Sequence, residues 1–263
     1  MRDYTGKTVW ITGASSGIGE ALAYAFGARG ARLVLSARRA ERLERVARGS
    51  GARDTLIVPL DLAQLDGLPG KVDEVIARMG AVDIMVHNAG VGQRSAVIDT
   101  DFAVDRKMME TNYLGPVALS KALLPSMLER KRGDFVVISS VLGVMSAKQR
   151  SGYCASKHAL HGYFNALRAE LSSEGISVLL VCPGHVSTEF SERALAGDGS
   201  AHGVVDKSTA SGLSAGETAR RTLLALDRGQ AEVYVARWEN WAVHLNRYAP
   251  SLMRRAIARV KMR

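Results

Sequence analysis

The sequence predicts an α/β protein with a doubly wound, seven-stranded parallel sheet flanked by helices, folded as one domain over residues 1–263. Seven short runs rich in apolar and β-branched residues alternate with longer segments of helical period. Most of these runs are apolar on both faces, which a strand needs when helices cover both sides of its sheet. A chain of 263 residues fits a single core, and no stretch rich in proline and glycine divides it.

Each element follows from these patterns in chain order. The predicted strands span residues 7–12, 32–36, 55–60, 82–87, 134–139, 176–182 and 232–235. The predicted helices span residues 18–29, 40–48, 68–79, 101–129, 152–173 and 215–227. Because strands and helices alternate, we expect right-handed βαβ units and therefore a parallel sheet. Ser214 and Glu217 form a capping box at the start of the last of these helices.

The composition excludes several classes of protein. A hydrophobic content of 47% with 23% charged residues is typical of a globular protein and argues against disorder. The absence of any run of eighteen apolar residues predicts no membrane-spanning helix, and the charged start Arg2-Asp3 predicts no signal peptide. The two cysteines, Cys154 and Cys182, are too few for a disulfide framework. We therefore expect a reducing, cytoplasmic setting.

The net charge of +9 is unevenly distributed along the chain. Residues 237–263 hold seven lysines and arginines against one glutamate, so they account for +6 of that charge. The rest of the chain is nearly balanced, which argues against a nucleic-acid partner. Residues 238–263 are therefore best described as a basic C-terminal tail.

The end of this tail predicts an amphipathic helix that begins at Pro250 or Ser251 and runs to Arg263. One side of that helix would carry Leu252, Met253, Ala256, Ile257 and Val260, and the other Arg254, Arg255, Arg259 and Lys261. Two interpretations stay open. The helix lies on an anionic membrane surface, or its apolar stripe packs on the protein's own body or on a partner subunit.

A glycine-rich turn follows the first predicted strand and leads directly into a helix. Glycines here let the backbone turn tightly and approach a pyrophosphate, and the helix start supplies free N–H groups. The position of the turn, in the first βα unit, favours a dinucleotide site of a Rossmann fold over a plain glycine-rich turn. The candidate residues are Gly13, Ser15, Ser16, Gly17, Ile18 and Gly19.

Tyr153 and Lys157 lie one helical turn apart on the same face of a predicted helix. An adjacent ammonium group favours the phenolate, so Lys157 is expected to lower the pKa of Tyr153 from about 10 toward the range of acid–base catalysis. Ser140 ends the fifth predicted strand, where it can donate a hydrogen bond to a substrate oxygen. Its neighbour Ser139 is the alternative. The competing interpretation of the pair is a buried core tyrosine and a solvated lysine.

The chain resembles the short-chain dehydrogenase/reductase family, in its compact single-domain branch, over residues 5 to about 235. The resemblance rests on motifs that occur in the family's order: Gly-x3-Gly-x-Gly from Gly13, Asn88-Ala89-Gly90, Asn112, Ser140 thirteen residues before Tyr153, Lys157, Pro183-Gly184 and Thr188. One departure is His87, which stands where the family usually has asparagine.

The resemblance implies an oxidoreductase that transfers hydride between a nicotinamide cofactor and a carbonyl or alcohol. It implies that Tyr153 is the general acid/base, that Lys157 also holds the nicotinamide ribose, and that Asn112 fixes a water in a proton relay. The implied catalytic residues are Asn112, Ser140, Tyr153 and Lys157. Beyond the glycine turn, the implied cofactor contacts are Asn88, Ala89, Gly90, Tyr153, Lys157, Pro183, Gly184 and Thr188.

Residues 33–39, 112–115 and 153–160 resemble the dehydrogenase/reductase member 7 group more closely than the family at large. Relatives of that group act on lipophilic carbonyls, often at membranes, so a lipophilic substrate is implied by analogy. We also expect a homodimer or homotetramer.

The end of the second predicted strand indicates which cofactor is bound. An NAD site places a carboxylate about twenty residues past the glycines, but the first acid here is Glu41. Arg38 and Arg39 instead match a 2′-phosphate, so we predict NADP(H), with two solvated arginines as the alternative. Asp61-Leu62 resembles the acidic adenine contact of the family, although Asp61 could equally cap a helix.

Residues 185–213 break the alternating pattern, because they are rich in glycine, serine and alanine and have little apolar periodicity. A connection of about thirty residues in a compact domain is more often a functional lid than a passive loop. We expect a mobile lid over the substrate that becomes ordered mainly when ligands bind.

Two other functions fit the same fold but are disfavoured, and no metal site is expected. A cofactor-binding sensor or scaffold with little turnover is disfavoured by the intact set of Ser140, Tyr153 and Lys157. An epimerase or dehydratase of the extended branch is disfavoured by the short chain and the glycine spacing. The histidines complete no ligand spacing, so we expect no metal; they are His158, His161, His185 and His202.

Overall fold

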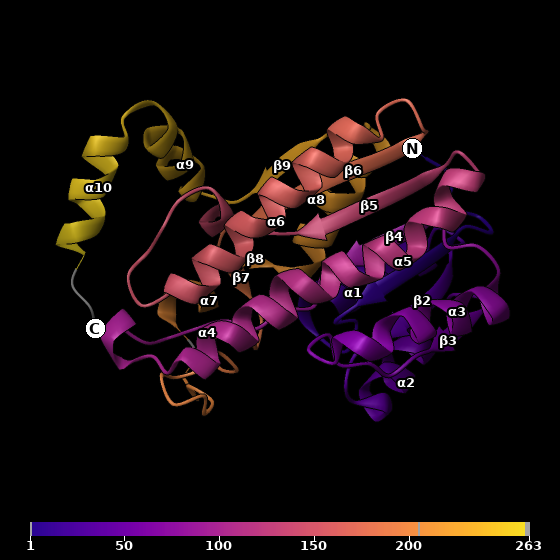
Figure 1. Ribbon diagram of the computed structural model, residues 1–263, viewed down its shortest axis with the longest axis horizontal. Coiled ribbons are helices and arrows are strands. Elements are labelled where there is room, and N and C mark those ends of the chain that lie inside the picture. Colours follow the sequence, from indigo (N-terminus) through magenta and orange to yellow (C-terminus); the bar gives the residue numbers. More distant parts are fainter. Residues whose placement is uncertain (1, 205, 261–263) are drawn as a thin grey trace.

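The computed structural model describes residues 2–204 and 206–260, and its centre is a seven-stranded parallel sheet (Figure 1). The strands are β1 (Thr8–Thr12), β2 (Arg32–Ser36), β3 (Thr55–Ile57), β4 (Ile84–His87), β5 (Gly133–Ile138), β6 (Ile176–Pro183) and β9 (Glu232–Val235). They lie in the order β3-β2-β1-β4-β5-β6-β9, and each pairing is parallel. The predicted doubly wound sheet is confirmed, with β3 shorter than expected.

Helices cover both faces of this sheet. One face packs against α1 (Gly17–Gly27), α2 (Ala40–Gly49) and α8 (Ala215–Asp227), and the other against α3 (Leu68–Met79), α5 (Gly115–Glu129) and α6 (Ser151–Glu170). Along each strand, alternate side chains pack into the hydrophobic clusters on the two opposite faces of the sheet. Ile11 lies in the first cluster and Trp10 in the second, and both are fully buried. Burial on both faces is why these strands are continuous apolar runs in the sequence.

The order of the strands reverses beside β1, because β2 and β4 flank it on its two sides. The loops that leave the carboxyl ends of β1 and β4 therefore diverge to opposite faces and open a crevice between them. Figure 1 shows α4 (Phe102–Met109), α7 (Lys207–Ala210), α9 (Glu239–Tyr248) and α10 (Pro250–Arg259) gathered at this end of the sheet.

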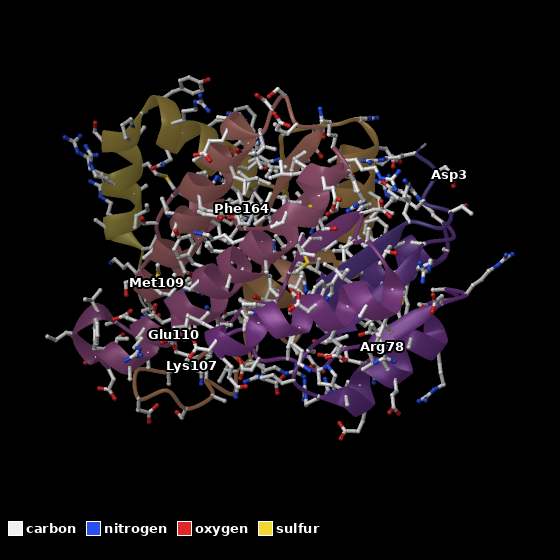
Figure 2. The ribbon with its side chains drawn as sticks, turned by 45° about the vertical axis from the view of Figure 1, so that its right-hand side comes forward. Asp3, Arg78, Lys107, Met109, Glu110 and Phe164 are labelled. Carbon is white, nitrogen blue, oxygen red and sulfur yellow. The ribbon has the colours of Figure 1, made fainter. Side chains whose placement is uncertain are left out.

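The helix predicted over residues 101–129 is confirmed as an unbroken helical segment from residue 102 to 129, but it is not α-helical throughout. The structure has α4, then a π-helical turn at Glu110–Leu114, then α5; Met109 and Glu110 mark the junction in Figure 2. Pro116 has no N–H for the carbonyl four residues earlier, which favours a wider turn at this point. Apolar periodicity alone does not reveal such a turn, because both segments keep the same buried face.

The C-terminal tail folds as two helices instead of one. α9 had not been predicted, and α10 ends at Arg259, whereas the predicted helix ran to Arg263; residues 261–263 lie outside the described residues. Smaller elements connect the rest: the 3₁₀ turns Leu65–Gly67, Val97–Asp99 and Val141–Gly143, and a two-stranded parallel pair, β7 (Val186–Ser187) with β8 (Leu213–Ser214). Among the described residues, no helix is both long and apolar enough to cross a bilayer.

His87 ends β4 but points into the core, away from the crevice. Its ring stacks parallel to Phe135 at a centroid distance of 6.0 Å and lies 5.5 Å from Phe164, which Figure 2 labels in the interior. Nε2 is 2.8 Å from the Ser120 hydroxyl, and Nδ1 has no hydrogen-bond partner among the described residues. Complete burial lowers the pKa of His87 to about 3.

This burial predicts a pH-dependent contribution to stability. The unfolded chain binds a proton on His87 near the ordinary pKa of about 6.5, whereas the folded chain binds it only near 3. Stability is therefore lost as the pH falls below about 6.5, at up to about 1.4 kcal/mol per pH unit from this residue. Urea unfolding of His87→Leu between pH 7 and pH 5 should show a correspondingly smaller slope than the wild type.

The control is His244→Leu, because His244 is exposed on α9 and should leave the wild-type slope unchanged. Equal slopes in His87→Leu and the wild type would show that His87 is not buried as a neutral ring.

Candidate active site

A cavity of about 1030 Å³ opens at the carboxyl end of the sheet, at the upper end of the usual size for ligand sites. All but two of the predicted site residues line it. They are Gly13, Ser15, Ser16, Gly17, Ile18, Arg38, Arg39, Asp61, Leu62, Asn88, Ala89, Gly90, Ser140, Tyr153, Lys157, Pro183, Gly184 and Thr188. The two exceptions, Gly19 and Asn112, are not among the lining residues.

The glycine-rich turn packs closely against the end of β4. Gly13 has φ +66°, and a Cβ there would come within 2.8 Å of the Cα of Ala89. A Cβ on Gly19 would lie 2.3 Å from the carbonyl oxygen of Gly13. Gly19 is therefore needed for close packing between helix and strand, and its contact with a cofactor stays a prediction.

The first turn of α1 faces the cavity through Ser16, Gly17 and Ile18. Gly17 has φ +59°, and a Cβ there would approach Thr188 Cγ2 to 3.1 Å. The first N–H groups of a helix have no intrahelical acceptor, and they lie at the positive end of its dipole. Side chains at the glycine positions would fill this turn. Without them, residues 13–19 form a concave backbone surface, the glycine cradle, which fits the pyrophosphate of a dinucleotide.

Arginines gather beyond this cradle, where β2 ends. Arg38 and Arg39 line the cavity, and burial lowers the pKa of Arg39 from its ordinary value, with further lowering from the nearby charges of Arg193, Arg42 and Arg38. Glu189 pairs with both Arg42, at 3.2 Å, and Arg193. Positive charge therefore remains in excess here, which suits a phosphate group.

Asp61 does not cap a helix, because the helices after β3 begin later, with Gln64 and Gly67 as their N-cap residues; its contact with adenine stays a prediction. Its side chain lines the cavity, and its Oδ1 also accepts a hydrogen bond from the backbone N–H of Ala63 at 3.0 Å. Leu62 is almost fully buried, and a Cβ on Gly115 would lie 2.7 Å from its Cβ. The turn after β3 is therefore fixed on one side by α5 and open to the cavity on the other.

Tyr153 and Lys157 project from α6 into the cavity. The start of α6 is held by Gln93, whose Oε1 accepts hydrogen bonds from the N–H groups of Gly152 at 2.8 Å and Tyr153 at 3.3 Å. Lys157 is 4% exposed; its Nζ lies 5.8 Å from the centroid of the Tyr153 ring and donates to the carbonyl of Ile138 at 2.9 Å. The Ser140 side chain is hydrogen-bonded to Tyr153.

The predicted lowering of the Tyr153 pKa by Lys157 is wrong for this arrangement. Burial raises the pKa of Tyr153 to about 12, and the hydrogen bond from Ser140 offsets only part of that rise. Burial also lowers the pKa of Lys157 to about 8. The physical reason is desolvation, which favours the neutral form of both groups, while the ammonium is directed at a carbonyl and not at the phenol.

The two neighbouring serines face different partners. Ser140 contacts Tyr153, and its Oγ accepts from the N–H of Leu142 at 3.1 Å. Ser139 lies on the other side, with its Oγ 3.5 Å from the Lys157 carbonyl and close to Gly143. Only Ser140 meets the phenol, as the spacing in the sequence indicated.

Asn112 supports the cavity wall from behind. It lies on the π-helical turn, where its Oδ1 accepts from the N–H of Val91 at 2.8 Å and its Nδ2 donates to the Val91 carbonyl and the Ser156 hydroxyl, both at 3.0 Å. These bonds fix the chain that leaves β4. Its role in a water relay stays a prediction.

Residues 185–213 are held more firmly than their composition suggested. The N–H of Leu195 donates to the Gly92 carbonyl at 2.9 Å, and the N–H of Arg94 donates back to the Leu195 carbonyl at 2.8 Å. Asp206 forms ion pairs with Arg94 and with Arg150, the latter at 3.2 Å. Polar contacts of this kind replace the apolar anchors that the sequence lacks. Whether the segment opens stays a prediction.

The C-terminal helices form a wall of the cavity that had not been predicted. Its apolar surface is contributed by Trp238, Trp241, Leu245, Met253, Ile257 and Val260. The stripe predicted on α10 thus faces the protein's own cavity, and Met253 is 7% exposed. Leu252 of the same stripe is 55% exposed and Val260 58%, so the stripe is only partly covered by the protein's own body, and both interpretations of the tail stay predictions. The spacing of Trp238, Trp241 and Leu245 is helical and was a usable signal.

One carboxylate joins α9 to the end of β6. Glu239 is buried and accepts hydrogen bonds from the backbone N–H of His185 at 2.9 Å and of Arg237 at 2.9 Å, while His185 Nδ1 lies 2.7 Å from its Oε1. A Cβ on Gly184 would come within 2.8 Å of this carboxyl group. The wall built by α9 and α10 is therefore attached directly beside the crevice.

Known proteins share both the sequence and this architecture. A family profile described as short chain dehydrogenase matches residues 7–198. A dehydrogenase/reductase SDR family protein 7-like of Anopheles gambiae is 43% identical over 262 residues, which cover 95% of this chain and 82% of that protein. A dehydrogenase/reductase SDR family member 7B of Bos taurus is 42% identical over 268 residues, which cover 98% of this chain and 82% of that protein.

Two solved structures give the same result for the fold. A short-chain dehydrogenase/reductase from Burkholderia phymatum in complex with NAD superposes with a TM-score of 0.85 at 25% identity and covers 96% of both chains. A metagenomic short-chain oxidoreductase in complex with NADP has a TM-score of 0.74 at 29% identity, over 89% of this chain and 98% of that one. The chain belongs to the short-chain dehydrogenase/reductase family of oxidoreductases.

Proposed function

We propose that this protein is an NADP(H)-dependent oxidoreductase that transfers hydride between the nicotinamide and a lipophilic carbonyl or alcohol. One observation carries the proposal: Ser140, Tyr153 and Lys157 meet on the wall of a cavity that the glycine cradle also lines. A cofactor sensor needs the cradle but has no use for a buried proton donor beside it, so turnover is favoured over sensing.

The side chains divide the chemistry between them. The glycine turn and Lys157 would hold the cofactor, which supplies or accepts the hydride when bound. Tyr153 is a neutral phenol at neutral pH, the form that donates a proton to the oxygen of a carbonyl as hydride reaches its carbon. Ser140 would donate a hydrogen bond to the same oxygen as negative charge develops there.

The arginine cluster supports NADP(H) over NAD(H). Arg38 and Arg39 lie where β2 ends, and neither Ser36 nor Ala37 offers the carboxylate that a ribose 2′-hydroxyl would need. The neighbouring Arg193 adds charge from the other side of the site, since it contributes to the lowered pKa of Arg39. A 2′-phosphate would neutralise charges that otherwise repel one another.

The substrate end of the cavity supports a lipophilic substrate. Its walls on α9 and α10 are aromatic and aliphatic, and Trp241 is 80% exposed at the rim. An exposed tryptophan beside an apolar cavity is costly unless a ligand or a surface covers it.

The outer surface of α9 and α10 supports contact with an anionic membrane. It exposes Trp238, Tyr248 and Leu252 between basic side chains, and the single acid on these helices, Glu239, is buried. Aromatic residues and arginines are the groups that bind at a lipid interface. Because the cavity is lined by the same two helices, a lipophilic substrate would enter directly from that surface.

The first test removes the phenolic oxygen. Tyr153→Phe keeps the ring packing and loses the transferable proton, so turnover of NADPH with a panel of ketones and aldehydes should fall roughly 100-fold or more. The dissociation constant for NADPH, measured by fluorescence, should stay close to that of the wild type. Lys157→Ala should impair both turnover and cofactor binding. Retention of more than about a tenth of the activity in Tyr153→Phe would rule out the proton-transfer assignment.

The second test reverses a charge at the adenosine end. Arg38→Asp should weaken NADPH binding by at least about tenfold, or about 1.4 kcal/mol, and improve the relative affinity for NADH. The matched control is Arg53→Asp, because Arg53 is an exposed arginine just before β3, at the amino ends of the strands and not among the residues that line the cavity. The prediction fails if the wild type binds NADPH and NADH equally, or if the two variants lose the same affinity.

The third test concerns the lipid surface. Each basic residue near an anionic bilayer contributes about 1 kcal/mol, so the double variant Arg254→Glu/Arg255→Glu should lower binding to anionic vesicles at least tenfold in sedimentation. Wild-type binding should decline with salt and be weak with neutral vesicles. The control carries the same charge change on α2, Arg45→Glu/Arg48→Glu. Equal loss in both pairs, or no wild-type binding, would contradict the membrane proposal.

A further inference from the structure

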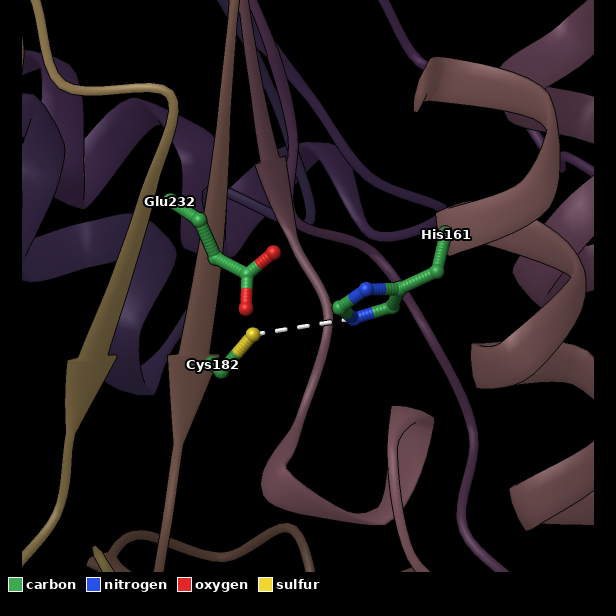
Figure 3. Close-up of side chains that lie close together, drawn as sticks. All are labelled: His161, Cys182 and Glu232. Atoms are coloured by element: carbon green, nitrogen blue, oxygen red, sulfur yellow. Dashed lines mark hydrogen bonds between the residues drawn. The ribbon is translucent and has the colours of Figure 1, made fainter. Parts of the chain in front are cut away.

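A second cluster of chemically active side chains lies behind α6, away from the cavity just described. It joins three elements: His161 on α6, Cys182 on β6 and Glu232 on β9 (Figure 3). None of the three lines the main cavity. His161 lies one helical turn beyond Lys157 on α6, but its side chain meets β6 and β9 and does not line the main cavity.

The three donor atoms are close enough to share one ion. An imidazole nitrogen, the thiol sulfur and a carboxylate oxygen all lie within 4.8 Å of one another. The Cys182 Sγ is 3.6 Å from the His161 Nε2. In a tetrahedral zinc site with Zn–S near 2.3 Å and Zn–N near 2.05 Å, sulfur and nitrogen are separated by about 3.6 Å. The pair thus has the spacing of two ligands on one ion.

The kind and burial of the donors also suit a metal. Cys182 is fully buried and His161 is 8% exposed, so neither side chain has water as an alternative partner. The Glu232 carboxylate reaches the other two donors from β9, the strand that pairs with β6. A mixed set of nitrogen, sulfur and oxygen donors favours Zn²⁺ over the hard cations Mg²⁺ and Ca²⁺.

We propose that His161, Cys182 and Glu232 form a zinc site, in which a water would complete the tetrahedron. The ion would connect β9 at the edge of the sheet, which pairs with β6 alone, to β6 and to α6. Its role would be to hold the last strand and the helix of Tyr153 together, independently of hydride transfer. The alternative use of the same atoms is a simple hydrogen bond between Cys182 and His161.

Cobalt(II) is the probe that separates these alternatives, because thiolate ligation gives a charge-transfer absorption that a hydrogen-bonded thiol does not. The full chain, free of any affinity tag and treated with a chelator, is titrated with Co²⁺ and then with Zn²⁺. We expect a thiolate-to-cobalt band at one equivalent, displaced by Zn²⁺. Zinc should also raise the melting temperature, since an ion that binds only the folded state stabilises it.

Variants identify the ligands. Cys182→Ser should abolish the charge-transfer band and weaken Zn²⁺ binding more than about 100-fold, because even partners outside the coordination shell contribute 10- to 100-fold. Cys154→Ser removes the other buried cysteine and should leave the band unchanged. Glu232→Gln, on the partly exposed edge strand, should weaken binding while keeping the fold. If circular dichroism shows that Cys182→Ser is unfolded, Glu232→Gln is the variant that tests the zinc site.

Three results would overturn the proposal. They are no charge-transfer band in the folded wild type, a band that survives in folded Cys182→Ser, and equal zinc affinity in Glu232→Gln and the wild type. Because metal binding is read without cofactor or substrate, failure here leaves the proposed oxidoreductase activity untouched, and the reverse also holds.

Discussion

The side chain of Asn88 holds the ends of β1 and β4 together, and the whole site is placed relative to this contact. Its Nδ2 donates to the carbonyl oxygens of Thr12 at 3.0 Å and Gly13 at 3.2 Å, while Thr12 Oγ1 accepts from the N–H groups of Asn88 and Ala89. These bonds satisfy backbone groups at a place where two parallel strands end and their loops diverge, so no ladder partner is available. The glycine turn can then lie against β4 only because positions 13 and 19 carry no side chain.

The same close packing determines the chemistry of the proposed catalytic pair. Lys157 is enclosed by the strand ends that Asn88 and Asn112 fix, and its ammonium is satisfied by one backbone carbonyl. Desolvation then moves the pKa values of Tyr153 and Lys157 apart, to about 12 and about 8. A phenol that stays protonated beside an amine that gives up its proton easily is suited to passing a proton inward from solvent. The fold provides this by burial alone, without a nearby carboxylate.

Much of this arrangement is encoded locally and could be predicted. The bounds of β2 and β9 were predicted to the residue from their short β-branched runs, and motifs at strand ends gave the part of the cavity lining at the carboxyl edge of the sheet but not the part on α9 and α10. What failed depends on contacts distant in sequence. The π-helical turn before Pro116 keeps the same buried face as a plain helix, so apolar periodicity does not reveal it. The segment of α9 is short, and its apolar residues could be recognised as a buried face only once the cavity that they line was known. His161, Cys182 and Glu232 come from three elements, so no spacing in the sequence indicates that their side chains lie close together.

The attachment of the C-terminal helices through Glu239 has a consequence for how the protein can diversify. Those helices supply the apolar wall of the cavity. Besides Glu239, they are attached through Asn246, which donates to the Val144 carbonyl, and through Lys148, which donates to the carbonyls of Ala258 and Val260. The cradle, the arginine cluster and the helix of Tyr153 all precede these helices in the chain. Sequence changes in about the last twenty-five residues would therefore reshape the apolar wall while leaving the residues proposed for catalysis and cofactor binding in place, provided that the contacts of Glu239, Asn246 and Lys148 are kept.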